Sequence, residues 1–350
     1  MKKAVSLFSG GGVGETYLND LDIKVTVSNE INHKRAQFYQ HLYPETKMII
    51  GDINDKRIKS EILNSLTGDE EILIATPPCQ GVSTLGKNKK VESFNFDKRN
   101  FLIYDVIEII DSFDFKYILI ENVSRFLKMK FPVQDGFDSV ENIFRNKFGR
   151  KYNIQVDILN TKDYEVPQSR PRFILRMFKK NTIWELPKTS PEITLRECIG
   201  HLPSLESNQS SKIQWHYAKK HNDREILAMK NTPTGKSAFK NKVYYPKNKN
   251  GDLIKGFHNT YKRLEWDRVC HARTTNCGTI GSHNNVHPGR RMEDGTYSDA
   301  RVLTIHELLI VSSLPLDWNI PEFASDNLVR QIIGESVPPR FIKKLFESIN

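Results

Sequence analysis

The first half of the chain alternates short apolar runs with stretches of helical spacing. The apolar runs predict strands at residues 4–8, 24–27, 48–50, 71–75, 117–120, 153–159 and 172–178. Apolar residues at Ile103, Val106, Ile107 and Ile110 follow the repeat of a helix over residues 101–113. Apolar strands separated by helices predict an α/β fold, in which a mostly parallel sheet is covered on both faces.

The pattern changes near Pro187. Beyond it the chain becomes polar and rich in Asn, Lys and His, and residues 240–255 have the composition of a loop. Helical spacing returns at residues 304–314 and again at 341–349. The sequence therefore predicts a change of organisation near residue 187.

Composition and charge narrow the class of protein. A chain of 350 residues with 38% hydrophobic residues is expected to fold, and no apolar stretch is long enough to span a bilayer. The first apolar run is too short for a signal peptide, and four irregularly spaced cysteines give no disulfide framework. We therefore expect a cytoplasmic protein, in whose reducing environment a reactive thiol survives.

The formal net charge of +10 is unevenly distributed. Residues 201–270 hold 14 Lys and Arg against 6 Asp and Glu. Both a solvated surface and a face that binds phosphates fit this excess.

Polar or special residues follow the predicted strands of the first half. Ligands of open parallel sheets bind beyond the carboxyl ends of the strands, so these residues are candidates for a common site. They are the glycine-rich segment 8–14, Glu30, Asp52, the segment Pro77-Pro78-Cys79-Gln80, and Glu121-Asn122.

The glycine-rich segment and the first two carboxylates predict a nucleoside-bearing cofactor. Glycines let the backbone approach a ligand closely, although the pattern here is not the G-x-G-x-x-G dinucleotide fingerprint. Glu30 comes 20 positions after Gly10, which suits an acceptor for ribose hydroxyls. Asp52 is placed to accept a hydrogen bond from an adenine amino group. These residues alone do not distinguish one nucleoside cofactor from another.

Cys79 is a candidate nucleophile. Glu121 follows the neighbouring strand, and Arg170 and Arg172 precede another strand. A thiolate adds to an electron-poor ring, a carboxyl group assists protonation of the ring nitrogen, and an arginine holds a carbonyl oxygen. An inert buried cysteine is the alternative for any cytosolic thiol, and the surrounding residues favour the reactive one.

These segments, in this order, resemble the cytosine-C5 DNA methyltransferases along nearly the whole chain. The matching segments are Leu7-Phe8-Ser9-Gly10-Gly11-Gly12, Pro78-Cys79-Gln80, Asp97-Lys98-Arg99-Asn100 with Leu102, Glu121-Asn122-Val123, Gln168-Ser169-Arg170-Pro171-Arg172, residues 301–307 and Gly334-Glu335-Ser336-Val337. A single such motif is a weak signal, but the ordered set is specific.

The resemblance implies a Rossmann-like, S-adenosylmethionine-dependent enzyme that methylates C5 of a cytosine flipped out of duplex DNA. It implies that Cys79 attacks C6, that Glu121 contacts and protonates N3, and that Arg172, with Arg170 beside it, binds the O2 carbonyl. It assigns Gln80 and Arg99 to DNA, in or next to a catalytic loop over residues 82–100. The implied cofactor-binding residues are Phe8, Gly10, Gly11, Gly12, Glu30, Asp52, Ile53, Pro78, Leu102 and Ser336.

The resemblance also predicts the domain organisation and the partners. It implies a discontinuous catalytic domain (1–187 and 326–350) and a smaller target-recognition domain (188–325), which contains the basic excess. It implies a bacterial or phage-encoded, nucleoid-associated modification enzyme, with a cognate restriction endonuclease as a functional partner. We expect a monomer, with no membrane partner and no metal.

Several residues depart from the family pattern. Ser6 stands where an acidic residue is common, Val13 interrupts paired glycines, His306 replaces an arginine, and Glu335 replaces an asparagine near the cofactor. The Glu335 carboxylate is expected to affect cofactor affinity and not the chemistry.

Three alternative interpretations stay open. Cys270, Cys277, His283 and His287 invite a zinc site, although their spacing is loose and lacks a C-x-x-C knuckle. An RNA-methylating enzyme of the tRNA type fits the same motifs, but its relatives have a shorter recognition segment. A non-catalytic DNA-binding homologue is the third alternative, and the intact set of Cys79, Glu121 and Arg172 argues against it.

Overall fold

The computed structural model describes residues 1–78 and 101–349, which form two compact units. The first unit comprises residues 1–160, 171–188 and 342–350. The second unit comprises residues 161–170 and 189–341. The expected change near residue 187 coincides with a boundary of these units. The segment 326–341, which the resemblance places in the catalytic domain, belongs to the second unit, as does the short segment 161–170.

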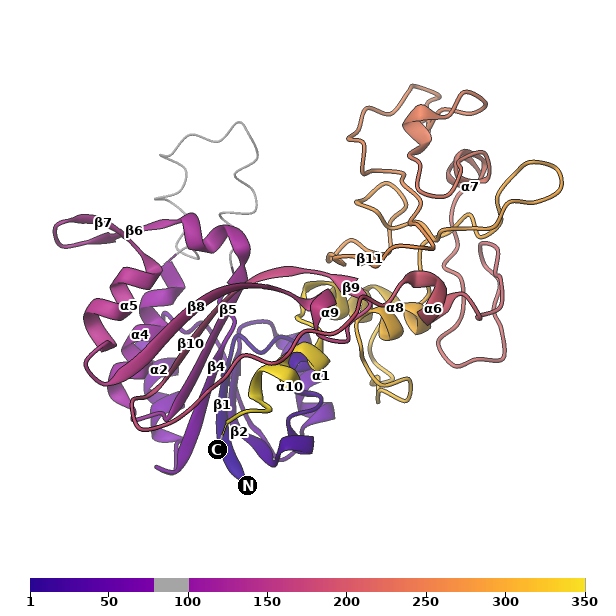
Figure 1. Ribbon diagram of the computed structural model, residues 1–350. Coiled ribbons are helices and arrows are strands. Elements are labelled where there is room, and N and C mark those ends of the chain that lie inside the picture. Colours follow the sequence, from indigo (N-terminus) through magenta and orange to yellow (C-terminus); the bar gives the residue numbers. More distant parts are fainter. Residues whose placement is uncertain (79–100, 350) are drawn as a thin grey trace. The chain divides into compact units, whose positions relative to one another are not determined.

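A seven-stranded sheet forms the centre of the first unit, in the order β3-β2-β1-β4-β5-β10-β8 (Figure 1). Its strands are β1 (Lys2–Leu7), β2 (Ile23–Glu30), β3 (Lys47–Ile50), β4 (Glu70–Ala75), β5 (Tyr117–Val123), β8 (Tyr152–Asn160) and β10 (Pro171–Lys179). The strands β1 to β5 run parallel, while β10 is antiparallel to both β5 and β8. The predicted α/β fold with a mostly parallel sheet is confirmed, and each predicted strand is present.

Helices cover both faces of the sheet, which explains why its central strands are apolar throughout (Figure 1). The helices of the unit are α1 (His33–Leu42), α2 (Lys56–Asn64), α4 (Leu102–Ser112) and α5 (Val140–Phe148), with a hairpin of β6 (Lys130–Val133) and β7 (Gly136–Ser139) before α5. Side chains of Asn32, Asp55 and Ser139 cap the first turns of α1, α2 and α5.

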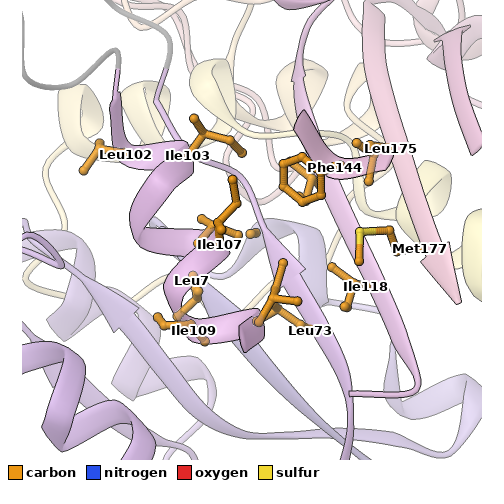
Figure 2. Packing of buried hydrophobic residues seen from close by; sticks show 14 of the residues in the cluster. Leu7, Leu73, Leu102, Ile103, Ile107, Ile109, Ile118, Phe144, Leu175 and Met177 are labelled. Carbon is orange, nitrogen blue, oxygen red and sulfur yellow. The ribbon is translucent and has the colours of Figure 1, made fainter. Parts of the chain in front are cut away.

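The main apolar cluster lies between the sheet and the helices α2, α4 and α5. Figure 2 shows Ile103, Ile107 and Ile109 of α4 packed near Leu7, Leu73 and Ile118 of the sheet. On the opposite face, the α10 residue Phe346 stacks on Trp184 with ring centroids 5.2 Å apart. Trp184 in turn packs edge-on against Tyr117 of β5. Alternate residues of each strand therefore face different layers.

The second unit has little regular structure. It contains β9 (Gln168–Ser169), β11 (Cys270–His271), α6 (Leu195–Ile199), α7 (Asp223–Lys230), α8 (Ile305–Val311) and α9 (Asp326–Glu335). The helix α10 (Pro339–Phe346) begins in this unit and ends in the first. The predicted helical segments 304–314 and 341–349 correspond to α8 and α10. No helix in the described residues is long and apolar enough to cross a bilayer.

A buried ion network lies within the second unit. Arg301 donates to Glu307 through two nitrogens, at 2.8 and 3.0 Å, and to Asp299 at 2.9 Å. Glu307 also accepts from the backbone of Thr304, completing a capping box at the start of α8. Charged side chains this deeply buried are stable only when they are paired in this way.

Candidate active site

Glu121 and Arg172 meet at the carboxyl end of β5. Glu121 is the fifth residue of β5, and Arg172 is the second of the antiparallel β10. In the register Glu121 lies opposite Ile174, so Arg172, two residues before Ile174, is its diagonal neighbour on the same face. Arg172 Nε lies 2.6 Å from Glu121 Oε1, and the side chains are 12% and 9% exposed.

The guanidinium of Arg172 is held in a defined orientation. Its Nη1 donates to the carbonyl of Pro171 at 2.9 Å, in addition to the Nε contact with Glu121. Burial lowers the pKa of Arg172, and the charge of Glu121 acts in the opposite direction. An arginine has about five N–H donors, so these two contacts leave it able to hold a carbonyl oxygen as well.

The segment that leads to Cys79 is attached to the same strand end. The amide of Asn122 donates to the carbonyl of Pro77 at 3.1 Å. Thr76 is tied to the end of β1, because its backbone N–H donates to Leu7 and its hydroxyl to Phe8. Pro78 is the last residue described before the gap. Cys79, Gln80 and Arg99 lie outside the described residues.

Arg170 has a different environment from Arg172. It is 4% exposed and belongs to the second unit. Its Nη1 donates to the carbonyls of Arg273 at 2.7 Å and Gly334 at 3.1 Å, and its Nη2 donates to the carbonyl of Glu335. These contacts favour an anchoring role for Arg170 over the catalytic role expected from the sequence.

The glycine-rich turn after β1 wraps around Glu30. Phe8 and Gly10 adopt positive φ angles of 60° and 57°, which turn the chain sharply after the strand. Gly10 N–H then donates to Glu30 Oε2 at 3.0 Å, while Asn32 N–H donates to Oε1 at 2.8 Å. Glu30 is 5% exposed. A carboxylate has about four acceptor positions, so it retains capacity for ligand hydroxyls.

Gly12 leaves space that another residue would fill. Its φ is +77°, and a Cβ atom there would lie 2.4 Å from Tyr43 Cε2 and 2.9 Å from Tyr39 Cδ2. The Tyr43 hydroxyl donates to the Gly12 carbonyl at 2.8 Å. The turn therefore needs glycine at this position.

Asp52 follows β3 at the adjacent strand end. It is exposed, and its Oδ1 accepts from the backbone of Asn54 at 3.0 Å. Gly51 links the two strand ends, because its N–H donates to the carbonyl of Glu30 at 3.1 Å. The structure therefore brings the glycine turn, Glu30 and Asp52 to neighbouring strand ends of the first unit.

Other predicted cofactor residues are less exposed or lie elsewhere. Ile53 and Leu102 are 2% and 6% exposed and belong to the apolar cluster of the first unit, in which Figure 2 shows Leu102. Ser336 belongs to the second unit, where its hydroxyl donates to Ile332 at the end of α9. Their contact with a cofactor stays a prediction.

Two of the four residues considered for zinc, Cys277 and His287, have other partners. Cys270 is buried in β11, and Cys277 Sγ donates to the carbonyl of Arg330. His287 lies between Asp299 and Glu307, and burial lowers its pKa to about 4. Within residues 1–78 and 101–349, no group of three His, Cys, Asp or Glu side chains is arranged to hold a metal ion.

Comparison with known proteins decides the family. The model of the C-5 cytosine-specific DNA methylases matches residues 2–350. The chain belongs to this family. This C-5 cytosine-specific DNA methylase is therefore an enzyme, a DNA (cytosine-5-)-methyltransferase, and the resemblance inferred from the motifs is confirmed.

Relatives and solved structures agree with this assignment. The methylase is 46% identical to the Type II methyltransferase M1.HgaI of Avibacterium volantium, over 100% of this chain and 99% of the relative. It is 25% identical to M1.HphI of Haemophilus parahaemolyticus, over 99% and 86%. Its fold is similar to those of Entamoeba histolytica EhMeth (TM-score 0.67, 14% identity, 99% and 97% coverage) and a variant of Spodoptera frugiperda DNMT2 (TM-score 0.63, 18% identity, 99% and 100% coverage).

Sequence reasoning missed some residues of the site. Glu15 is buried beneath the glycine turn, where the Ser6 hydroxyl donates to it. The signal in the sequence was Ser6 itself, which stands where an acidic residue is common. Tyr43, which holds the Gly12 carbonyl, gave no comparable signal in the sequence.

Proposed function

We propose that this methyltransferase methylates C5 of a flipped-out cytosine within a specific sequence of duplex DNA, through a covalent bond between Cys79 and C6. The observation that carries the proposal is the contact between Glu121 and Arg172, next to the segment that leads to Cys79. A carboxyl group and a guanidinium on one face suit the edge of a pyrimidine. The Glu121 carboxyl group would contact the ring N3 and the exocyclic amine, and the Arg172 guanidinium would hold the O2 carbonyl.

The glycine turn fits S-adenosylmethionine as the cofactor. Glu30 would accept from the ribose hydroxyls, Asp52 from the adenine amino group, and the turn at Gly10–Gly12 would pass close to the ligand. The polar groups at this site are two carboxylates and backbone groups. Carboxylates suit a neutral nucleoside better than a polyphosphate, which they would repel. When bound, S-adenosylmethionine supplies an electrophilic methyl group.

The chain's own residues activate the base. The Cys79 thiolate forms a bond to C6, and the electron pair of the C5–C6 double bond becomes available at C5 as N3 takes a proton from Glu121. Arg172 stabilises the negative charge that develops toward O2. After C5 has been methylated, loss of its proton to a base restores the double bond and expels the thiolate.

We propose that the enzyme is the modification component of a Type II restriction–modification system. The support is the full-length similarity to Type II methyltransferases such as M1.HgaI. A cognate endonuclease would be a functional partner that cuts the same sequence when it is unmethylated. The basic residues between 201 and 270, which belong to the second unit, would contact the phosphates of DNA.

Methyl transfer from labelled S-adenosylmethionine into duplex DNA tests the proposal, with tRNA as the competing substrate. Bisulfite sequencing of DNA from a host that expresses the protein then locates the modified cytosines. We expect label in duplex DNA, confined to one sequence, and no label with Glu121→Gln. Glu71→Gln is the control, because Glu71 is the second residue of β4, at the end of the sheet opposite the site, and pairs with Lys116. Label in tRNA alone, or tight duplex binding without methyl transfer, would contradict the proposal.

A further inference from the structure

A buried carboxyl group lies beneath the glycine turn. Ser6 is the penultimate residue of β1, and its neighbours Val5 and Leu7 face the main apolar cluster, so Ser6 faces the opposite side of the sheet. Glu15 ends the short 3₁₀ helix Val13–Glu15, which begins directly after Gly12. Glu15 is 7% exposed, and the Ser6 hydroxyl donates to its Oε1.

The second oxygen of this carboxyl group is not satisfied. Within the part of the chain that the structure describes, Glu15 Oε2 is buried and no donor meets hydrogen-bond geometry with it, although the Tyr39 hydroxyl lies beside the carboxyl group and the Ser28 hydroxyl lies beside Tyr39. A buried acceptor without a donor is costly, and a buried negative charge without a cation is more so. No cation among the described residues pairs with this carboxyl group, so a negative charge on Glu15 has only neighbouring hydroxyls to stabilise it.

Among the residues that the structure describes, the groups around Glu15 are neutral. Ser6 faces it from β1, and α1 with its C-terminal end contributes Tyr39 and Tyr43, while Ser28 of β2 lies against Tyr39. The nearby helix α10 places its Lys343 against Asp20, at 2.7 Å. Burial raises the pKa of Glu15 to about 7, and the hydroxyls of Ser6 and Tyr39 lower it only in part. The carboxyl group is therefore poised between its charged and neutral forms near neutral pH.

Glu15 is also connected to the glycine turn. The rings of Tyr39 and Tyr43 lie 4.8 Å apart, and the Tyr43 hydroxyl donates to the carbonyl of Gly12. The turn that would approach the cofactor thus rests on the same side chains that surround Glu15. S-adenosylmethionine carries a positive charge on sulfur, whereas S-adenosylhomocysteine, the product of methyl loss, is a neutral thioether.

We propose that Glu15 is a positioning residue whose carboxylate provides the counter-charge for a cationic methyl donor, and that it thereby favours the donor over the demethylated product. This inference rests on the proposed function, because it takes S-adenosylmethionine as the donor. Binding of the cation stabilises the ionised form, so Glu15 releases its proton to solvent when the donor binds. The product lacks the sulfur charge and releases less.

Calorimetric titration of the full-length protein with each of the two ligands, between pH 5.5 and 8.5, tests this inference. The amino and carboxylate groups of the ligands are the same, so the ratio of their dissociation constants isolates the effect of the sulfur charge. We expect the preference for the donor to increase with pH across about 7, by about tenfold for each unit by which the cation lowers the pKa of Glu15. Titration in buffers of different ionisation enthalpy should show more proton release with the donor than with the product.

Two variants and a control complete the experiment. Glu15→Gln should abolish the pH dependence of the ratio and the extra proton release. Ser6→Ala keeps the charge but removes a hydrogen bond to it, so it should move the pH dependence to higher pH. Glu70→Gln removes a buried carboxylate that binds the turn at Thr67 and Gly68, at the opposite end of the sheet, and should leave the ratio unchanged.

The outcomes distinguish the role of Glu15 from the identity of the cofactor. If Glu15→Gln binds both ligands with the ratio and pH dependence of the wild-type protein, the inference is wrong and the proposed function stands. If Glu15→Gln does not fold, an unshifted pH dependence in Ser6→Ala overturns the inference in the same way. If the wild-type protein binds neither ligand, the proposed cofactor is wrong, and the inference fails with it.

Discussion

Arg172 Nε lies 2.6 Å from Glu121 Oε1, on the same face of two antiparallel strands. Each side chain fixes the orientation of the other, because both are nearly buried and the strand register sets their spacing. The pair can therefore present an acid and a guanidinium to one edge of a ring without rearranging. Such preorganisation is a large part of how enzymes stabilise a developing charge.

Arg172→Lys should lower kcat strongly and leave the protein folded. Lysine keeps the positive charge but loses the planar fork that contacts Glu121 and Pro171 simultaneously. By analogy with the removal of one oxyanion donor, we expect a loss in kcat of about 100-fold. Arg145→Lys is the matched control, because Arg145 pairs with Glu141 on the partly exposed face of α5. A wild-type kcat in Arg172→Lys, measured with saturating DNA and cofactor, would contradict the proposed role.

Gly12→Ala should lower the affinity for the cofactor in addition to lowering the stability of the fold. An alanine at a φ of +77° costs about 1–2 kcal/mol, and its Cβ would also collide with the Tyr43 ring. Gly68→Ala is the control, because Gly68 has a φ of +99° and no atom within 4 Å of an added Cβ. We expect both variants to melt at lower temperature, with Gly12→Ala alone losing at least tenfold in affinity for S-adenosylmethionine. Equal affinities in the two variants would show that the glycine turn does not contact the cofactor.

Arg170→Met should destabilise the second unit without removing the chemistry. The substitution leaves the buried carbonyls of Arg273, Gly334 and Glu335 without their donor. Each such loss costs about 1–3 kcal/mol, so we expect a clear drop in the temperature of unfolding. The rate of methyl transfer per folded molecule, measured below that temperature, should stay within about threefold of wild type, far from the 100-fold loss typical of a missing charge-stabilising donor. A loss as large as that of Arg172→Lys would restore Arg170 to the catalytic set.

Glu307→Gln should remove part of the acid sensitivity of the second unit. Burial alone would raise the pKa of Glu307, but the charges of Arg301 and His287 lower it to about 2. A lowered pKa means that the stabilisation is complete above the ordinary value of 4.5 and is lost as the pH falls toward about 2.

At pH 7 we expect Glu307→Gln to cost about 3 kcal/mol in the free energy of unfolding, because Arg301 loses a buried partner. Below pH 3 the difference from wild type should shrink. Chemical denaturation at several pH values measures both effects, with the exposed Glu293→Gln as control. A difference between variant and wild type that does not change with pH would show that the Glu307 charge does not contribute.

The sheet could be predicted from sequence because its strands are buried on both faces. Continuous apolar runs such as Tyr117–Ile120 have no other stable position in a folded protein. The hairpin β6–β7 was not predicted. Its strands have four residues each and are largely exposed, so they give no apolar pattern. The antiparallel direction of β10 was not predicted either, because strand direction depends on the connection between strands and not on the apolar pattern.

Only those site residues that lie at the carboxyl ends of predicted strands could be brought together from the sequence. Glu30 is the last residue of β2 and Glu121 lies near the carboxyl end of β5, so their position on the rim follows from the sheet alone. Arg170 and Arg172 are alternate residues of one motif, yet they belong to different compact units because the chain leaves β9 for β10 between them. The contact between Ser6 and Glu15 depends on the path of a short 3₁₀ helix, which has no periodic signal.

The most direct test of the central claim is whether Cys79 becomes covalently attached to a target cytosine. Duplex DNA that carries 5-fluorocytosine at the target site blocks the final loss from C5, so the thioether should persist. With S-adenosylmethionine present, mass spectrometry of the digested complex is expected to find the base attached to Cys79, and Cys79→Ala should give no adduct. An adduct at another residue, or full methylation of normal DNA by Cys79→Ala, would contradict the account.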